Sequence, residues 1–558
     1  MVYWAQSFGR GALPMKPQTV NDYFKQHLGR VALFALFTLG VSFFAPLKNF
    51  QLKWLIDSRS MGEALGYMGL VFAITFTSWF FERLSRRSFT KLACGAVEQV
   101  RCRILEQVLH RTVAQYNAEG DAAYISLLTT DLRTLYDDYY MSLFNIVFWG
   151  GIMLCALGMY LYISPVMLAA ILLVTIPPLV LPRKMNERLK VTRDAFSLKM
   201  ADYTQQLKEL LGGFEVIRSF LREDAYAARH QDAARQARQS EQDYQQSLNA
   251  MVTNTSLISN LIFPVVMLVG LFLAFSGRLT MGTVSTAASM ANFVITPCHQ
   301  IAQCWAKVKS SKGIRQRLEA AMAAPAAPEM SEAGEPVGKI EHIVCKDVGF
   351  AYPGAAQPVL RDATLTVSGT QKVALVGESG CGKSTLAKLL FQYYPDYTGD
   401  ILFNGKQVRE LDRRSFYGRV GYIAQTAYIF NDTLRQNICL REDFPEEQLA
   451  HAIAAAGLAD WVATLPEGLD TVLSENGKNL SGGQRQRIGI ARLALRKYDL
   501  IIADEITASL DPETSAQVMQ NLMQMPCMVV AITHDTSGAF MQEFDQIYRV
   551  EHGVVSAG

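Results

Sequence analysis

Charged residues are scarce in this sequence. Only 19% of its 558 residues are Asp, Glu, Lys or Arg, below the ~25% typical of soluble domains. The charges nearly cancel, with 53 Lys+Arg against 51 Asp+Glu, so bulk charge gives no support for a nucleic-acid partner. The nine cysteines include no CxxC pair, and 50% of the residues are hydrophobic. This composition excludes a disordered chain, a collagen-like chain and a small disulfide scaffold.

Hydrophobic residues are concentrated in the first 310 residues or so. A membrane-spanning helix needs about 20 mainly apolar residues, and a soluble protein of this length could not bury six such segments. The sequence therefore predicts an all-α six-helix transmembrane domain over residues 29–320, in contact with the lipid bilayer. The six apolar stretches lie at 29–47, 64–81, 141–163, 166–181, 257–276 and 281–301.

Basic residues cluster after the second, fourth and sixth stretches. By the positive-inside rule this pattern places both termini in the cytoplasm. The connectors 82–140 and 183–247 are long and helix-patterned, so we expect the transmembrane helices to extend into the cytoplasm. Residues 1–28 are predicted to be an N-terminal cytoplasmic segment, with a short interfacial helix or an unstructured tail at 15–28. No acidic side chain lies mid-span, which disfavours an ion-coupled carrier.

A second domain is expected after a linker at 321–338 that is rich in Ala, Pro and Gly. From 339 to 558, short strand-like runs alternate with helical runs, which is typical of an α/β domain. The fold class predicted for the chain is therefore multidomain, with a helical membrane domain followed by an α/β domain.

A phosphate-binding loop lies near the start of the α/β half. The strand-like run at 372–376 leads into a complete G-x-x-x-x-G-K-[ST] pattern and then a helical run, so this half is predicted to be a P-loop ATPase domain. We expect Lys383 to reach the β- and γ-phosphates and Ser384 to ligate Mg²⁺. The nucleotide-binding residues predicted here are Gly377, Glu378, Ser379, Gly380, Cys381, Gly382, Lys383, Ser384 and Thr385.

Two carboxylates follow a second buried strand-like run at 500–503. Asp504 is expected to hold Mg²⁺ in the second coordination sphere, and Glu505 is a candidate to polarise the attacking water. Two solvated carboxylates at a strand end are the alternative, which the P-loop in the same chain disfavours.

A further motif lies between these two: Leu480-Ser481-Gly482-Gly483-Gln484, followed by RQRIGIARLAL. It closely resembles the signature of ATP-binding cassette (ABC) transporters, and the resemblance covers 340–550. It implies ATP and Mg²⁺ as cofactors and Glu505, Gln425 and His534 as catalytic residues. The other residues it assigns to the ATP site are Tyr352 stacking on adenine, Gln425 sensing Mg²⁺ and water, Ser481, Gly482, Gly483 and Gln484 in the signature, and Asp511 in the D-loop Ser509-Leu510-Asp511.

The membrane half resembles the six-helix exporter type of the same family. The runs at 130–140 (TDLRTLYDDYY) and 212–220 (GGFEVIRSF) fall where that family has the cytoplasmic coupling helices that press on the ATPase domain. One departure is Glu475-Asn476-Gly477, where exporters often have Glu-Arg-Gly.

One P-loop and one signature imply half of a transporter, because the family binds ATP between the P-loop of one subunit and the signature of the other. The intact Glu505, Gln425 and His534 favour a homodimer, with a heterodimer as the alternative. We expect ATP-driven export of a peptide, lipid or hydrophobic small molecule across a bacterial inner (plasma) membrane, with the ATPase domain in the cytoplasm.

Two other functions are alternatives to export. One is import of a metal chelate such as a siderophore, and the other is a membrane-anchored ATPase with a regulatory or channel role. In the sixth stretch, Cys298, His299 and Cys304 raise the hypothesis of contact with a metal or haem-like cargo. A polar lining beside a kink at Pro297 is the simpler interpretation.

Overall fold

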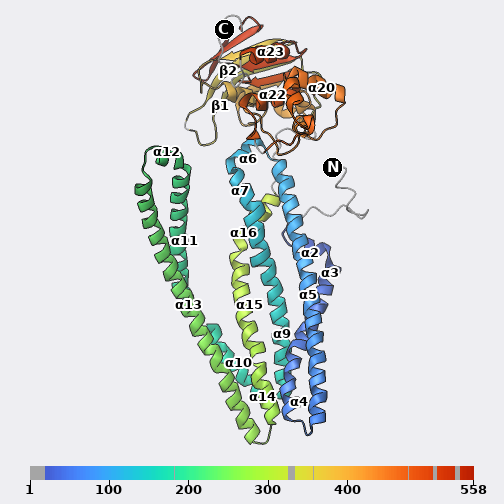
Figure 1. Ribbon diagram of the computed structural model, residues 1–558, viewed down its shortest axis with the longest axis vertical. Helices are drawn as coiled ribbons and strands as arrows, with labels where there is room; N and C mark the ends of the chain where they lie inside the picture. Colours follow the sequence, from blue (N-terminus) through green and yellow to red (C-terminus); the bar gives the residue numbers. More distant parts are fainter. Residues whose placement is uncertain are drawn as a thin grey trace. The chain divides into compact units, whose positions relative to one another are not determined.

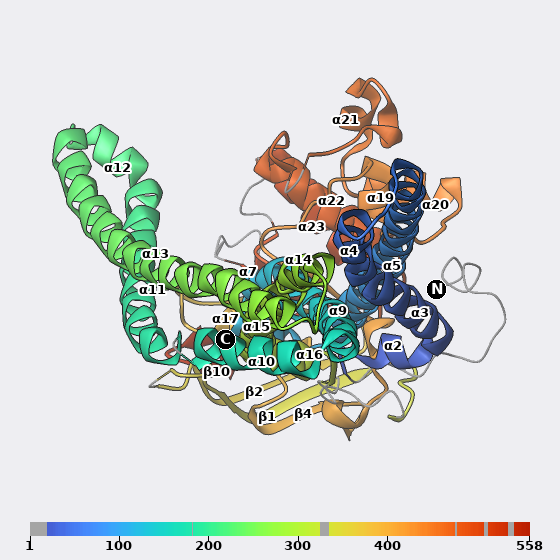
Figure 2. The same ribbon diagram turned by 90° about the horizontal axis from the view of Figure 1, so that it is seen from below.

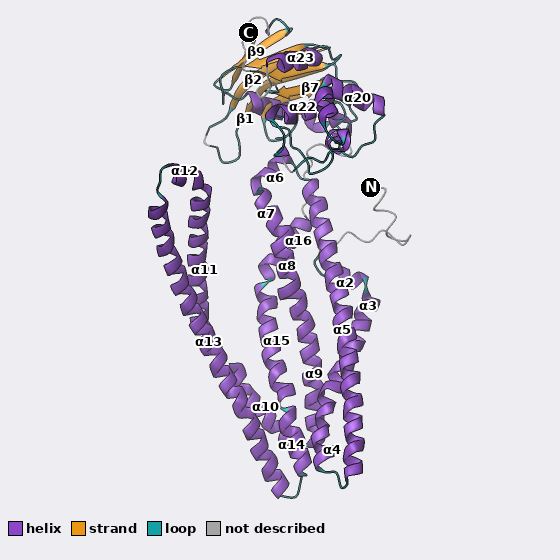
Figure 3. Cartoon of the chain, in the orientation of Figure 1, coloured by secondary structure: helices purple, strands orange, loops and turns teal. Residues whose placement is uncertain are grey.

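The structure, a computed structural model, describes residues 19–180, 182–323, 334–355, 357–474, 477–506, 512–533 and 541–557. The chain divides into two compact units, Met1–Val108 with Ala122–Ala324 and Leu109–Asp121 with Pro325–Gly558. All described strands lie in the second unit, and the first is helical (Figure 3). This agrees with the predicted fold class. Most of the predicted linker, 324–333, lies outside the described residues.

The first unit is a set of long helices with short connecting elements (Figure 1). Its helices are α2 (Asp22–Gln26), α3 (Leu28–Leu47), α4 (Gln51–Ile56), α5 (Met61–Leu109), α7 (Asp121–Ser126), α8 (Leu132–Thr134), α9 (Met141–Ile163), α10 (Pro165–Val180), α11 (Pro182–Gly212), α12 (Phe214–Ser219), α13 (Glu223–Phe275), α14 (Met281–Met290), α15 (Asn292–Ser310) and α16 (Lys312–Ala323). A 3-10 turn, η1 (Lys48–Phe50), precedes α4, and two π-helical segments, η2 (Leu127–Asp131) and η3 (Leu135–Tyr140), flank α8.

The predicted apolar stretches fall in these helices. The stretches at 29–47, 64–81 and 141–163 lie in α3, α5 and α9, and 166–181 lies in α10 as far as the described residues reach. The last two lie in α13 and across α14 and α15. In the described chain, three helical segments have the length and apolar composition to cross a membrane, and a fourth apolar helix is shorter: Leu28–Ile56, Met61–Leu109, Asp121–Ile163 and, shorter, Asn260–Phe275.

The helices also extend beyond the predicted spans. Helix α5 has 49 residues, which at 1.5 Å per residue gives a length of about 74 Å, more than twice the ~30 Å of a hydrocarbon core. Its apolar half exposes Phe72, Phe76 and Trp79, with more than half of each side chain accessible, as expected for a surface that faces lipid. The connectors at 82–140 and 183–247 are therefore largely helical, as the sequence indicated.

Helices α11 and α13 lie side by side and are joined at their tip by α12 (Figures 1 and 2). The predicted coupling run at 212–220 thus forms a short helix, α12. The other predicted run, at 130–140, lies in the η2–α8–η3 run that continues into α9. A separate short helix, α6 (Val113–Glu119), lies between α5 and α7. A Thr112/Gln115 capping box starts it and Gly120, at φ 77°, ends it.

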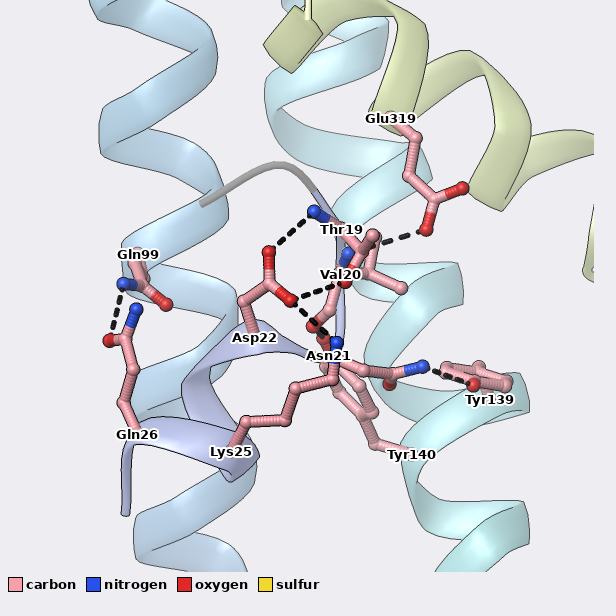
Figure 4. A network of polar contacts seen from close by, with 10 residues as sticks. All are labelled: Thr19, Val20, Asn21, Asp22, Lys25, Gln26, Gln99, Tyr139, Tyr140 and Glu319. Atoms are coloured by element: carbon pink, nitrogen blue, oxygen red, sulfur yellow. Dashed lines mark hydrogen bonds and ion pairs between the residues drawn. The ribbon is translucent and has the colours of Figure 1, made fainter. Parts of the chain in front are cut away.

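The short helix α2 is tied to elements far away in the sequence (Figure 4). The side-chain amide of Asn21 donates to the Tyr139 hydroxyl at 2.9 Å, and the Tyr140 hydroxyl donates to the Val20 carbonyl. The Val20 backbone N–H donates to Glu319 of α16 at 3.3 Å. The predicted N-terminal segment thus contains a five-residue helix, α2, and the two residues before it contact η3 and α16, while residues 1–18 lie outside the described chain.

A second group of contacts holds α15 and α16 to the π-helical segments. Lys307 pairs with Asp138 at 3.4 Å, and Arg317 pairs with the buried Asp131 at 3.3 Å. The guanidinium of Arg315 lies 4.2 Å from the ring centroid of Tyr139. Widened π-helical turns are common at functional sites, and here they carry the residues that contact the last helix of the unit.

The second unit contains two sheets and surrounding helices. The antiparallel four-stranded sheet has the order β2-β1-β4-β5, and the mainly parallel six-stranded sheet has the order β10-β9-β3-β8-β7-β6. The strands are β1 (His342–Phe350), β2 (Leu360–Ser368), β3 (Lys372–Val376), β4 (Thr398–Phe403), β5 (Lys406–Gln407), β6 (Val420–Ile423), β7 (Leu500–Asp504), β8 (Met528–Ile532), β9 (Gln546–Glu551) and β10 (Val554–Ala557). The helices are α17 (Lys383–Leu390), α18 (Arg413–Tyr417), α19 (Leu434–Cys439), α20 (Glu446–Ala455), α21 (Ala459–Thr464), α22 (Gly482–Ala494) and α23 (Pro512–Met523), with 3-10 turns η4 (Val408–Glu410) and η5 (Gly468–Asp470).

The order of the parallel strands positions the candidate site. Strands β3, β7 and β8 are buried at every residue, with side chains from both faces in hydrophobic cores. Because β3, β8, β7 and β6 run parallel, their carboxyl ends meet at one edge of the sheet. The P-loop, the Asp504–Glu505 pair and Gln425 follow β3, β7 and β6, so this edge collects three of the predicted motifs.

Candidate functional site

The P-loop joins β3 to α17 through positions that require glycine. A Cβ atom at Gly377 would collide with the Val550 carbonyl oxygen, and one at Gly382, where φ is 114°, would lie 2.8 Å from Leu360 Cδ2. Helix α17 begins at the next residue, so its first backbone N–H groups face the loop. Backbone donors and the positive end of a helix together favour a bound phosphate.

Lys383 lies across this loop. Its side chain is 4% exposed, and Nζ donates to the carbonyl oxygens of Gly377 and Glu378, both at 2.8 Å. The ammonium group is therefore held over the loop by neutral acceptors. A phosphate oxygen that carries negative charge is a stronger acceptor than either carbonyl, so the lysine is poised to exchange partners.

Ser384 and Asp504 meet at the edge of the sheet. The Ser384 hydroxyl donates to Asp504 Oδ1 at 2.9 Å, and the Tyr422 hydroxyl donates to Asp504 Oδ2 at 3.1 Å. Burial raises the pKa of the Asp504 carboxyl above its ordinary value, while the two hydroxyl donors act in the opposite direction. The two oxygens that the sequence assigned to Mg²⁺ are thus adjacent, in a set of oxygen donors of the kind that Mg²⁺ prefers.

Glu505 follows in an uncommon backbone conformation, with φ 51°. A left-handed conformation costs a residue with a side chain roughly 1–2 kcal/mol, so surrounding contacts must maintain it. Its N–H donates to the Ile532 carbonyl at 3.2 Å, and its carboxylate accepts from Gln425 Nε2 at 2.8 Å. The structure therefore pairs the candidate water-polarising carboxylate with the predicted sensor glutamine.

Tyr352 belongs to an aromatic cluster beside α17. Its ring lies at 89° to Tyr394, with the ring centroids 5.3 Å apart, and at 81° to Phe350 at 5.0 Å. Its hydroxyl lies 3.0 Å from Thr385 Oγ1, so two residues of the predicted nucleotide site are in contact. The ring is half-buried, and its predicted stacking on adenine stays a prediction.

A cleft of about 1010 Å³ opens between the P-loop and the end of β9 with the turn that follows it. Its walls include predicted loop residues, among them Gly377, Glu378 and Cys381, together with three basic residues that the sequence analysis did not select: Arg361, Arg549 and His552. Basic side chains beside a phosphate-binding loop fit an anionic ligand.

The signature forms the start of α22. Ser481 caps this helix through a capping box, in which Gln484 N–H donates to Ser481 Oγ at 3.1 Å and Ser481 N–H donates to Gln484 Oε1 at 2.8 Å. Gly482 and Gly483 form the first helical residues. The segment is a regular helix N-terminus that presents backbone donors, which is the arrangement expected for anion binding.

Several predicted residues lie outside the described chain. They are Asp511 with the rest of the D-loop, Ser509 and Leu510, the switch residue His534, and Glu475 and Asn476 before the signature. Their assignments remain predictions from the resemblance.

Two polar residues at the site were missed by sequence reasoning. Tyr422 contacts Asp504, and Gln486, which is 2% exposed, donates from Nε2 to the Glu505 carbonyl oxygen at 3.0 Å. A signal for Gln486 was available, since it shares the buried face of α22 with Gly483, Ile490 and Leu493 at spacings of three and four residues. A glutamine in such an apolar stripe indicates a buried polar partner.

The cargo hypothesis for the sixth stretch gains no support. Cys298 Sγ lies 3.6 Å from Met153 Sδ of α9, and Cys304 is buried. Over the part of the chain that the structure describes, no three His, Cys, Asp or Glu side chains gather as they would around a metal ion.

Two family models match the chain. The model described as ABC transporter matches residues 360–508, and the model described as ABC transporter transmembrane region matches residues 31–298. Together they cover well over half of the sequence.

Known relatives align along most of the chain. ATP-dependent lipid A-core flippases of Pseudomonas fluorescens and Salmonella typhimurium are 26% and 27% identical, over 91% and 82% of this chain and 88% and 79% of their own lengths. A solved structure of a bacterial Atm1-family ABC exporter with ATP bound has the same fold, with a TM-score of 0.80 at 21% identity, covering 96% of this chain and 95% of its own.

The P-loop, the signature and the Asp504–Glu505 pair all lie within the residues that the ABC transporter model matches. Each family region occurs once, fused in one chain. The chain belongs to the ABC transporter family, as a half-transporter whose ATPase domain couples ATP hydrolysis to transport across a membrane.

Proposed function

We propose that two copies of this chain form an ATP-driven lipid exporter in a bacterial inner membrane. The observation that carries the proposal is the arrangement at the carboxyl edge of the sheet, where Lys383, Ser384, Asp504, Glu505 and Gln425 converge. Each of these five side chains has a geometry suited to one part of ATP hydrolysis.

ATP binding begins at the P-loop. Lys383 exchanges its two carbonyl acceptors for the β- and γ-phosphate oxygens, and the N-terminus of α17 adds backbone donors. Tyr352 stacks on the adenine ring, and the other P-loop residues, Glu378 to Gly382 and Thr385, surround the triphosphate. The basic cleft residues Arg361 and Arg549 add positive potential nearby.

The oxygen atoms near the end of β7 are of the kind that Mg²⁺ prefers. Ser384 Oγ and Asp504 Oδ1 are 2.9 Å apart and, together with the Gln425 side chain, would hold the ion. When bound, the ion would neutralise negative charge on the phosphates. The Tyr422 hydroxyl holds the second oxygen of Asp504 and so fixes the orientation of the carboxylate.

Hydrolysis is assigned to Glu505. Its carboxylate polarises a water molecule for attack on the γ-phosphate, and Gln425 holds that carboxylate in place. From the family resemblance, His534 contacts the γ-phosphate and Asp511 belongs to the D-loop that lines the site. In the proposed dimer, Ser481 and the start of α22 of one copy contact the γ-phosphate of the ATP bound by the other copy. Hydrolysis removes this γ-phosphate and with it the contact.

Dimerisation is required because the two parts of each ATP site come from different copies. The P-loop of one copy and the signature of its partner enclose one ATP, so two copies bind two ATP molecules. Nucleotide binding draws the ATPase domains together and hydrolysis releases them, which gives a two-state element that can switch the membrane helices between inward- and outward-facing states. The short helix α12 is the surface proposed to transmit this movement.

Lipid is the proposed substrate class because the relatives are named as flippases. Their names also favour export over uptake of a metal chelate. The basic clusters after the second, fourth and sixth apolar stretches put the ATPase domain and both termini in the cytoplasm. Export then means movement from the cytoplasmic leaflet to the outer one.

Reconstitution in vesicles tests the proposal. The purified protein is placed in liposomes with fluorescent lipids in one leaflet. Mg-ATP is added outside the liposomes, where it reaches only the molecules whose ATPase domains lie on the outside. We expect ATP-dependent lipid movement between leaflets that is lost in Glu505→Gln. Lipid movement that is equal in this variant and the unaltered protein would contradict the proposal, as would ATPase activity that never couples to lipid movement.

Subunit composition is tested separately. The mass of the detergent-solubilised complex, measured by native mass spectrometry, should correspond to two copies of the 62.0 kDa chain. A stoichiometric partner of different sequence would overturn the homodimer.

A further inference from the structure

We propose that Gln486 is a positioning residue that links the signature helix α22 to the catalytic carboxylate of the same chain. The inference rests on the proposed role of Glu505 in hydrolysis. Gln486 Nε2 donates to the Glu505 carbonyl oxygen at 3.0 Å, and Gln486 lies on the helix that Ser481 caps.

The backbone of Glu505 needs support at this point. With φ at 51°, the residue is in a conformation that an L side chain rarely adopts. Its N–H is bonded to Ile532 of β8 and its carbonyl oxygen to Gln486, so these two contacts hold the peptide groups on either side of Cα. The side chain then points to Gln425. Removing one backbone anchor frees Glu505 to rotate away.

The glutamine is unusual for a buried residue. It is 2% exposed, and its Oε1 atom accepts no hydrogen bond among the described residues. A buried acceptor without a partner lowers stability, so an apolar residue of equal length would suit the helix packing better. The hydrogen bond from Gln486 Nε2 to the Glu505 carbonyl oxygen explains why a polar amide occupies this buried position.

This contact gives the two ATP sites of a dimer a direct connection. In the proposed dimer, Ser481 touches the ATP held by the partner, while Glu505 acts on the ATP held by its own P-loop. Both are attached to α22, Ser481 as its cap and Glu505 through Gln486. A displacement of α22 when the signature binds phosphate therefore moves Glu505, so occupancy of one site adjusts the geometry of the other.

The test compares Gln486→Met with a matched control, Gln392→Met. Gln392 is also a buried glutamine of the second unit, 1% exposed, whose amide donates to a backbone carbonyl, that of Leu389 at 3.0 Å. It lies after the far end of α17. Methionine preserves length and removes the donor in both variants.

We expect Gln486→Met in the full-length protein in detergent to lower the kcat for ATP about 10- to 100-fold, as for other small displacements of a reacting group. The KM for ATP and equilibrium binding of a fluorescent ATP analogue should stay within about twofold of the unaltered protein. Gln392→Met should retain kcat within about twofold, even if it lowers the melting temperature as much as Gln486→Met does.

A double-mutant cycle shows whether the effect passes through Glu505. In a Glu505→Gln background, adding Gln486→Met should change the residual rate less than about twofold, because the residue it positions has lost its function. An equal loss in both backgrounds, or a kcat for Gln486→Met no lower than that of Gln392→Met, would overturn the inference. If Glu505→Gln itself retains full activity, the proposed catalytic role fails, which is a separate result.

Discussion

Gln425 and Glu505 are 80 residues apart in the chain, yet Gln425 Nε2 donates to Glu505 Oε2 at 2.8 Å. The bond crosses from the segment after β6 to the end of β7, two neighbouring parallel strands. A neutral amide holds the carboxylate without compensating its charge. The Gln425 amide therefore fixes the orientation of the Glu505 carboxylate.

Glu505→Gln is expected to retain ATP binding and to lower turnover at least about 100-fold, since it removes a general base without changing side-chain size. Phosphate release and equilibrium binding of a fluorescent nucleotide measure the two properties. Glu447→Gln, an exposed carboxylate on α20, is the control and should behave as the unaltered protein. Full ATPase activity in Glu505→Gln would remove Glu505 from its proposed role.

Lys383→Ala should weaken nucleotide binding about 10-fold or more, because a charge-assisted contact to phosphate is lost. It also removes the donor to the Gly377 and Glu378 carbonyls, so the loop is expected to become less ordered. Isothermal titration with ATP in the presence of Mg²⁺ measures the affinity. Lys346→Ala, an exposed lysine on β1, should have no effect, and an unchanged affinity in Lys383→Ala would contradict the assignment.

Tyr422→Phe should shift the pH dependence of ATPase activity. The Tyr422 hydroxyl bond favours ionised Asp504 and so lowers its pKa, against the larger effect of burial, which raises it. Without the hydroxyl the pKa of Asp504 rises further. Because the ionised carboxylate is needed to bind Mg²⁺, activity should then fall at a higher pH as the solution is acidified, and more Mg²⁺ should be needed.

The control for this variant is Tyr417→Phe. The Tyr417 hydroxyl donates to the Phe391 carbonyl at 3.3 Å, and both tyrosines contact the Phe391 ring. The ATPase activities of Tyr422→Phe and Tyr417→Phe are compared from pH 5.5 to 8.5, roughly the range in which proteins are most stable. Equal acid limbs in the two variants would show that the Asp504 contact has no catalytic consequence.

Two substitutions of Tyr352 distinguish stacking of its ring from hydrogen bonding by its hydroxyl. Tyr352→Ala should weaken ATP binding roughly 5- to 100-fold, the range expected for loss of a base-stacking ring. Tyr352→Phe keeps the ring and removes the contact with Thr385, so its affinity should stay within about twofold. If both variants lose affinity equally, the hydroxyl contact with Thr385 matters and the ring does not.

Much of the ATP site was predictable because its signals are local. The strand, loop and helix around Lys383 follow one another in the sequence, and the glycine at 382 is required by a local backbone angle. The apolar stretches of the membrane half predicted helices for the same reason, since length and apolar composition are properties of a single segment. The fold class followed from these two patterns.

The unpredicted features depend on strand order and on packing between distant segments. Tyr422 contacts Asp504 only because β6 and β7 are neighbours in the sheet, and nothing in either strand states that order. The run at 130–140 shows a different limit. The family resemblance suggested a coupling helix there, whereas in the fold Asp131, Asp138 and Tyr139 contact α15 and α16.

The capping box of Ser481 leaves room for a second role of the same hydroxyl. The serine oxygen accepts the Gln484 N–H, and an N-cap of this kind is worth about 1 kcal/mol. A hydroxyl can accept one hydrogen bond and donate another, so the proposed contact with a phosphate oxygen can form without loss of the cap. In the proposed dimer, one side chain would therefore both fix the start of α22 and contact the ATP of the partner.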